Sequence, residues 1–213
     1  MKPNDLAAQL ARYARGKVPA ALRREQILAR AHELFVERGY HGSSMDELAR
    51  RVGVTKPVVY KLAGSKQQLF RDVMETINAQ LTAAITAAVA PKTTLEGKLR
   101  AGIGAFLAFV RGHRDGWVAL LSAEAGPAST EVADLRRRQV AIVAALLAQH
   151  LDGGPFAAEP RLREALAFAV NGAVEFASCW WLEQSNLDTD TLADMLSRML
   201  AHGLLALADR ESE

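Results

Sequence analysis

The segment TKPVVYK, at positions 55–61, concentrates side chains whose chemistry suits a nucleic acid. Lys56 can donate a hydrogen bond to guanine O6 or N7, and Val58 can touch a thymine methyl group. Thr55 can bind either a base or a phosphate. The segment has no Arg, Asn or Gln, the side chains that read bases through two hydrogen bonds. Direct base readout is therefore expected to be modest, leaving a role for DNA shape.

These side chains need a helix that presents them outward, and the surrounding sequence predicts one. Two short amphipathic segments are joined by Val52-Gly53-Val54, and Ala49 is small enough for a close helix crossing. This spacing is typical of a helix-turn-helix. Thr55 is placed to cap the second helix, and Pro57 falls in its first turn, where a missing N–H is tolerated.

A further helix is expected to cover the apolar side of this pair. Apolar residues recur at helical spacing between Ala21 and Arg38, and Gly39 suits the end of that helix. Ser44, with Glu47 three residues later, predicts a capped start for the next helix. Two short helices around a glycine also occur in helical proteins that do not bind DNA, so the surroundings of the motif matter.

Positive charge gathers in the same part of the chain. The formal net charge is +2, but positions 1–66 hold 13 Lys and Arg against 6 Asp and Glu, which leaves 13 against 18 for the rest. A basic surface attracts phosphates and makes binding depend on salt. Basic residues also serve solubility, so the asymmetry supports a DNA-binding surface without proving one.

Between Arg24 and Phe70 the chain carries Leu34-Phe35, Gly39-Tyr40, Val52-Gly53-Val54 and Ser65-Lys66 at characteristic spacing. With these residues the segment resembles the DNA-binding domain of the TetR/AcrR transcriptional regulators. It departs at Leu62-Ala63, where that family usually has an aromatic residue or histidine and then phenylalanine. The resemblance implies major-groove and phosphate contacts from Ser43, Ser44, Thr55, Lys56, Pro57, Val58, Tyr60, Lys61 and Lys66.

The residues before position 22 predict a basic N-terminal arm with a short helix over Asp5 to Ala14. Arms of this kind can reach into an adjacent minor groove with arginine. Arg12 and Arg15 are the candidate contacts. A terminal tail without a role is the alternative.

The remainder of the chain reads as long helices and predicts an all-α fold. The helix from Lys66 would join two domains and act as a lever between them. The predicted domains are the basic arm (1–21), a three-helix helix-turn-helix DNA-binding domain (22–66) and a helical ligand-binding and dimerisation domain (67–213). Its later helices are expected at Thr93 or Thr94 to Gly112, Trp117 to Ala123, Thr130 to Leu151, Pro160 to Ser185 and Asp188 to Asp209.

The final two helices are apolar over more than one stripe, which a lone helical hairpin cannot hide from water. A homodimer through a four-helix bundle solves this problem, and the family resemblance implies the same. Two recognition helices held about 34–36 Å apart would read a palindromic operator. The expected interface residues are Ala169, Ala173, Phe176, Trp180, Leu192, Met195, Leu196 and Met199.

Aromatic residues of the middle helices can line a cavity for an apolar ligand, although such residues more often form plain core. Asn171, Glu175 and Ser178 share one face of an apolar helix and need partners when buried. The arginines at 136–138 or the rim of a dimer interface are preferred to ligand groups as those partners. The candidate ligand-binding residues are Phe106, Phe109, His113, Trp117, Asn171, Glu175 and Ser178.

Other functional classes find little support. The single cysteine, Cys179, excludes an intramolecular disulfide and fits a reducing cytoplasm. The five histidines lack metal-ligand spacing, and no phosphate loop or nucleophile elbow occurs, so we expect no metal, no cofactor and no enzyme. No secretion signal is evident, and the apolar run from Ala165 to Leu182 is interrupted by Asn171 and Glu175.

Together these patterns predict a cytoplasmic homodimeric repressor that a small apolar or aromatic effector releases from its operator. The alternative is a ligand-independent dimeric DNA-binding protein whose C-terminal domain serves only dimerisation. A third hypothesis is a small-molecule-binding enzyme with a vestigial basic domain. A cavity lined by Phe106, Phe109 and Trp117 would favour the effector-responsive form, and a solid core the ligand-independent one.

Overall fold

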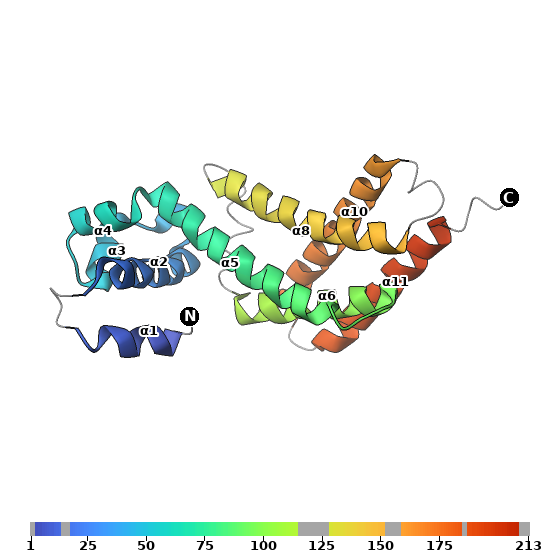
Figure 1. Cartoon of the computed structure of the whole chain (residues 1–213), viewed down its shortest axis with the longest axis horizontal. Helices are drawn as coiled ribbons and strands as arrows, with labels where there is room; N and C mark the ends of the chain where they lie inside the picture. Colours follow the sequence, from blue (N-terminus) through green and yellow to red (C-terminus); the bar gives the residue numbers. More distant parts are fainter. Residues whose placement is uncertain (1–2, 14–17, 115–127, 152–158, 185–186, 209–213) are drawn as a thin grey trace. The chain divides into compact units, whose positions relative to one another are not determined.

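A computed structural model describes residues 3–13, 18–114, 128–151, 159–184 and 187–208 (Figure 1). Over these ranges the chain forms nine α-helices and no strand, which confirms the predicted all-α fold. The expected helix from Trp117 to Ala123 lies outside the described residues. The helices are α1 (Pro3–Leu10), α2 (Ala20–Gly42), α3 (Met45–Val52), α4 (Lys56–Ala63), α5 (Lys66–Val89), α6 (Leu95–Gly112), α8 (Ala128–His150), α10 (Pro160–Glu183) and α11 (Thr189–Ala208).

Capping residues set the limits of several helices, as their sequence predicted. Ser44 Oγ accepts a hydrogen bond from the Glu47 N–H at 3.1 Å at the start of α3. Thr94 Oγ1 accepts one from the Gly97 N–H at 3.1 Å at the start of α6. Gly53, with φ of 75°, provides the left-handed turn that ends α3 and lets the chain enter α4.

The helices group into two compact units. The first holds α1 to α4 and the beginning of α5 up to Ile77, and the second holds α5 from Asn78, α6, α8 from Ala133, α10 and α11. The predicted domain limits at positions 22 and 66 remain a prediction.

In the first unit, α2, α3 and α4 pack around a small apolar core. Ile27, Leu34, Leu48 and Val59, which come from all three helices, are at most 1% exposed. Burial of each such side chain contributes about 1.5–3 kcal/mol to folding. The core therefore fixes α3 and α4 against α2, and α1 lies beside α2.

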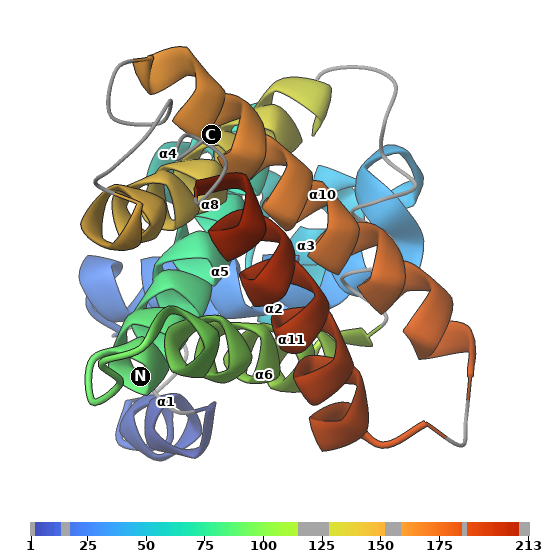
Figure 2. The same ribbon diagram turned by 90° about the vertical axis from the view of Figure 1, so that its right-hand side faces the viewer.

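In the second unit, α6 packs along α11, as Figure 2 shows. One side of α6 is buried at Leu95, Leu99, Ile103, Phe106, Leu107 and Val110. Among the described helices, α10 alone has the length and composition to cross a membrane. Its Val170, Val174 and Trp181 are nevertheless buried within the protein.

Candidate DNA-binding surface and ligand cavity

The outer side of α4 carries the side chains that the sequence assigned to DNA. Lys56, Pro57 and Lys61 are exposed, and Tyr60 is 46% exposed. Val58 is half-buried, whereas Val59 is fully buried in the core. Thr55 is exposed at the N-cap position, although its side chain makes no capping hydrogen bond. The name α4 surface is used below for Ser44, Thr55, Lys56, Pro57, Val58, Tyr60 and Lys61.

Lys56 is paired within the protein. Its Nζ donates a hydrogen bond to Asp46 Oδ2 of α3 at 2.7 Å. This contact raises the pKa of Lys56 above its ordinary value, so the ammonium group stays charged at neutral pH. A phosphate or base that binds Lys56 must either compete with the Asp46 carboxylate or accept one of the other two ammonium protons.

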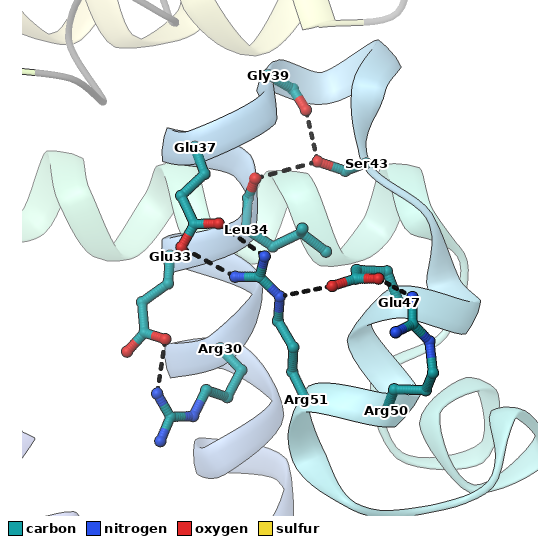
Figure 3. Close-up of polar contacts among 9 residues, drawn as sticks. All are labelled: Arg30, Glu33, Leu34, Glu37, Gly39, Ser43, Glu47, Arg50 and Arg51. Carbon is teal, nitrogen blue, oxygen red and sulfur yellow. Dashed lines mark hydrogen bonds and ion pairs between the residues drawn. The ribbon is translucent and has the colours of Figure 1, made fainter.

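The two serines before α3 have different surroundings. Ser43 is only 6% exposed, and its hydroxyl is placed to donate to the carbonyl oxygens of Gly39 at 2.6 Å and Leu34 at 3.2 Å (Figure 3). The Ser43 hydroxyl therefore stabilises the end of α2 and does not face solvent, contrary to its expected place among surface phosphate contacts. Ser44 is exposed, and its hydroxyl proton is not used by the cap.

A carboxylate–guanidinium bridge, which no sequence pattern had indicated, joins α2 to α3 (Figure 3). Arg51 donates to both carboxylate oxygens of Glu37 at 3.0 and 2.6 Å and to Glu47 at 3.1 Å. Hydrogen bonding from Arg51 holds the pKa of Glu37 and of Glu47 below its usual range. Arg50 also pairs with Glu47. The bridge thus secures the angle at which α3 leaves α2.

Lys66 begins α5, where Ser65 Oγ accepts a hydrogen bond from the Gln68 N–H at 3.1 Å. The Lys66 ammonium lies 4.5 Å from the centroid of the Tyr40 ring, and burial lowers the pKa of Lys66. Phe70 meets Tyr40 edge-on with centroids 5.0 Å apart. Arg12 is exposed in the turn after α1, whereas Arg15 lies outside the described residues.

The second unit contains an apolar cavity of about 520 Å³ between α5, α6, α8 and α10. Ile103 and Phe106 of α6, Val143 of α8 and Val174 of α10 contribute to its walls. Of the predicted ligand-binding residues, Phe106 and Asn171 line this cavity. Its size is within the range typical of small-molecule sites.

The other predicted ligand-binding residues that the structure describes do not line this cavity. Phe109 stacks on His113 with ring centroids 4.1 Å apart. Glu175 accepts hydrogen bonds from Arg136, the closest at 2.6 Å, which confirms the arginine partner considered from the sequence. Ser178 donates to the Glu175 carbonyl oxygen at 2.6 Å. Trp117 lies outside the described residues.

Sequence reasoning missed Gln139, which lines the cavity and is 5% exposed. Its amide nitrogen has no hydrogen-bond partner within the described part of the chain. The available signal was an amide followed by apolar residues three, four and seven positions later in the helix expected from Thr130 to Leu151.

The surface of α10 and α11 exposes several large apolar side chains. Phe176 is 79% exposed, Trp180 54%, Met195 55% and Met199 56%. Ala169 is also exposed, and Ala173 is half-buried. Leu192 and Leu196, expected at the same interface, are only 1% and 4% exposed because they pack inside the unit's own core. We call the remaining expected interface residues, Ala169, Ala173, Phe176, Trp180, Met195 and Met199, the α10–α11 surface. Large apolar side chains exposed in this way are typical of protein interfaces.

Comparison with known proteins connects this geometry to a family of regulators. The HTH-type transcriptional activator FasR from Mycolicibacterium smegmatis is 38% identical over 101 residues, which are 47% of this chain and 46% of FasR. The match thus covers less than half of that relative. A TetR-like regulator from Rhodococcus sp. RHA1 is 28% identical, with a TM-score of 0.68 over 89% of this chain and 99% of its own.

A more distant solved structure, the transcriptional regulator FadR from Bacillus subtilis, has the same fold. It is 17% identical, with a TM-score of 0.66 over 84% of this chain and 98% of its own. The family model for bacterial regulatory proteins of the tetR family matches residues 27–73. The model for the tetracyclin repressor-like C-terminal domain matches residues 95–203, about half of the chain. The chain therefore belongs to the tetR family of DNA-binding, helix-turn-helix transcriptional regulators.

Proposed function

We propose that the protein is an effector-responsive repressor that binds a palindromic operator as a homodimer. The observation that carries the proposal is the apolar cavity of about 520 Å³ that four helices of the second unit line. A unit that served only to dimerise would gain stability by packing side chains into such a space, because this would remove more apolar surface from water. The cavity is thus better explained as a binding site.

The α4 surface supports the DNA-binding part of the proposal. It places the ammonium groups of Lys56 and Lys61 and the hydroxyl of Tyr60 on the outward side of a helix anchored by Val59. Cationic and hydroxyl donors at this spacing suit phosphates and base edges. The α10–α11 surface supports dimerisation, which would present two copies of α4 to the two halves of an operator.

A molecule with an apolar chain is the first effector class to test. The cavity walls are formed mainly by aliphatic side chains and Phe106. The FadR regulator from Bacillus subtilis, which shares the fold, was solved in complex with stearoyl-CoA. An acyl chain would fill the space between α6, α8 and α10 without leaving charged groups in it.

Release from DNA follows if the effector binds more tightly to a conformation that fits the operator poorly. The size of the shift is limited by that difference in affinity, and moving a population from 1:99 to 99:1 needs about 10⁴-fold. Helix α5 is suited to couple the two events. It contributes Phe70 to the aromatic contacts of the first unit, and Ile85 and Val89 to the cavity of the second.

Activation of transcription is a second candidate function, because the relative FasR is named an activator. A reporter gene behind the selected operator distinguishes the two. Expression rises on deletion of a repressor's gene and falls on deletion of an activator's gene.

The first experiment selects bound sequences from a random DNA pool and measures operator affinity with and without stearoyl-CoA. We expect the effector to lower operator affinity at least about tenfold, which corresponds to a coupling of about 1.4 kcal/mol. Val143→Trp, which should fill the cavity, is expected to keep operator binding and lose the response. If calorimetry detects effector binding and operator affinity does not change, the ligand-independent alternative replaces this proposal.

A further inference from the structure

One polar side chain in the cavity lacks a partner. Gln139 is 5% exposed, and its Nε2 makes no hydrogen bond within the described residues. Nearly all buried polar groups in folded proteins are hydrogen-bonded, because an unpaired buried donor loses its contact with water without replacement. A buried amide nitrogen without an acceptor, on a residue that lines a cavity, suggests that a molecule bound in the cavity provides the acceptor.

The neighbouring cavity wall offers few acceptors. Gln139 shares one face of α8 with Ile142, Val143 and Leu146, at spacings of three, four and seven residues. The facing helices contribute mainly aliphatic or aromatic side chains, and their polar side chains are Thr86 of α5, Lys98 of α6 and Asn171 of α10. A purely hydrocarbon ligand would leave the Gln139 amide nitrogen without a hydrogen-bond acceptor.

Further along α8 the cavity has a polar pair that is already satisfied. Lys98 Nζ donates a hydrogen bond to Gln149 Oε1 at 3.2 Å, and both residues line the cavity. Gln149 follows Gln139 by ten residues, or about 15 Å along a helix. Gln149 already has a hydrogen-bond partner, whereas the Gln139 amide nitrogen has none in the described part of the chain. Gln149 therefore provides a matched control.

We infer that the effector carries a hydrogen-bond acceptor, such as a ketone, ester or amide carbonyl, that binds the Gln139 amide. Its apolar body lies along α8 in the direction of Gln149. This assignment rests on the proposed function, because it names the chemistry recognised in the proposed effector cavity. Gln139 thus separates carbonyl compounds from hydrocarbons of the same shape.

The test uses two probes of nearly identical shape, butyrophenone and butylbenzene, which differ by a carbonyl group in place of a methylene. Binding to the full-length protein is measured by calorimetry for the wild type, Gln139→Leu and Gln149→Leu. The ratio of the two dissociation constants is compared between proteins, because the different water solubility of the probes then cancels. We expect Gln139→Leu to shift this ratio about tenfold toward butylbenzene, and Gln149→Leu to leave it unchanged.

Each outcome separates the inference from the proposed function. An equal ratio in the wild type and in Gln139→Leu would overturn the inference alone. The predicted shift without any effect of butyrophenone on operator affinity would support the inference and count against release by the effector. If neither probe binds, the inference is overturned, and the proposed function is judged by the experiment with stearoyl-CoA.

Thermal unfolding without ligand provides an independent readout. Gln139→Leu removes an unpartnered buried amide, so we expect its melting temperature to rise by about 2–4 °C. Gln149→Leu, which breaks the contact with Lys98, should not raise it. A lower melting temperature or loss of folding in Gln139→Leu would show that the amide has a structural partner, and would overturn the inference.

Discussion

Two cationic side chains near the proposed DNA surface are paired with carboxylates, but with different consequences. Lys56 and Asp46 are 46% and 66% exposed, so their ion pair is readily exchanged in water. Arg51 is 22% exposed and holds two carboxylates, so its charge is committed to the protein's own structure. Lys56 is therefore the better candidate for binding DNA, and Arg51 the better candidate for positioning α3.

Truncation of the α4 surface is expected to weaken operator binding without affecting assembly. Lys56→Ala and Tyr60→Ala should each lower affinity about tenfold, because each removes a contact from both halves of the operator. Lys92→Ala, at an exposed lysine of the second unit, should have little effect. Gel shifts measure operator affinity, and sedimentation measures assembly into dimers. Unchanged operator binding in both α4 variants would exclude this surface as the reader.

Removal of the Asp46 carboxylate should raise the affinity for DNA, in contrast to truncation of Lys56 or Tyr60. Asp46→Asn releases Lys56 and removes a negative charge that would face phosphates. We expect tighter binding to all DNA, a steeper loss of affinity with salt and poorer discrimination between operator and scrambled sequence. Asp190→Asn in the first turn of α11 is the control. Fluorescence anisotropy over a salt series measures the DNA affinity of both variants. Equal affinities and equal salt dependence for Asp46→Asn and Asp190→Asn would refute this role of Asp46.

At the scale of helices, local signals were sufficient to predict most limits. Ser44 and Thr94 provide caps, and α5 begins at Lys66 as expected, because helix ends depend on residues close in sequence. Contacts between helices were not accessible in this way. The Arg51–Glu37 pair joins residues fourteen positions apart, and its formation depends on how α2 crosses α3.

The difference between local signals and contacts between helices also explains which site residues could be predicted from the sequence. The exposed face of α4 follows from helical periodicity, so its residues were predicted with only Val58 half-buried. Leu192 and Gln139 were misjudged because their burial depends on which helix packs against them. A helix that is apolar on two sides does not reveal which side faces its own core.

The α2–α3 bridge should make stability depend on acid in a defined direction. Because Arg51 lowers the pKa of Glu37 and Glu47, the bridge contributes fully above the pKa of unfolded glutamate, about 4.3. This contribution is lost as pH falls through the lower pKa of the folded state. We expect Arg51→Met to lower the melting temperature by a few degrees at pH 7 and by less at pH 3.

Arg30→Met is the matched control for that experiment, because Arg30 pairs only locally with Glu33 at 2.7 Å on the surface of α2 (Figure 3). Its variant should change the melting temperature little at either pH. Circular dichroism melts of the three proteins provide the comparison. Equal destabilisation of Arg51→Met at both pH values would mean that packing of the side chain, not its charge, supports α3.

At the scale of the whole molecule, operator recognition depends on the proposed pairing of two chains. The α4 surface has few side chains for bidentate base contacts, so one copy should discriminate weakly between sequences. Two copies joined through the α10–α11 surface bind two half-sites at once, and the second binding event becomes intramolecular. Specificity would then reside largely in the spacing of the half-sites.

Phe176→Glu should separate the subunits and thereby weaken operator binding without altering the α4 surface. Phe176 is 79% exposed, and a carboxylate there would be desolvated on assembly. We expect a monomer in sedimentation and at least about a hundredfold loss of affinity for the palindrome, with affinity for an isolated half-site unchanged.

Phe168→Glu is the matched control, since Phe168 is also on α10 and is 49% exposed. It lies eight residues before Phe176, about 80° away around the helix axis, and lines a groove with residues of α8. This variant should remain dimeric and bind the palindrome normally. If both variants dissociate, the interface extends over the groove beside α8. If Phe176→Glu stays dimeric, the subunits pair through a different surface, and the spacing of the two α4 helices must be set there.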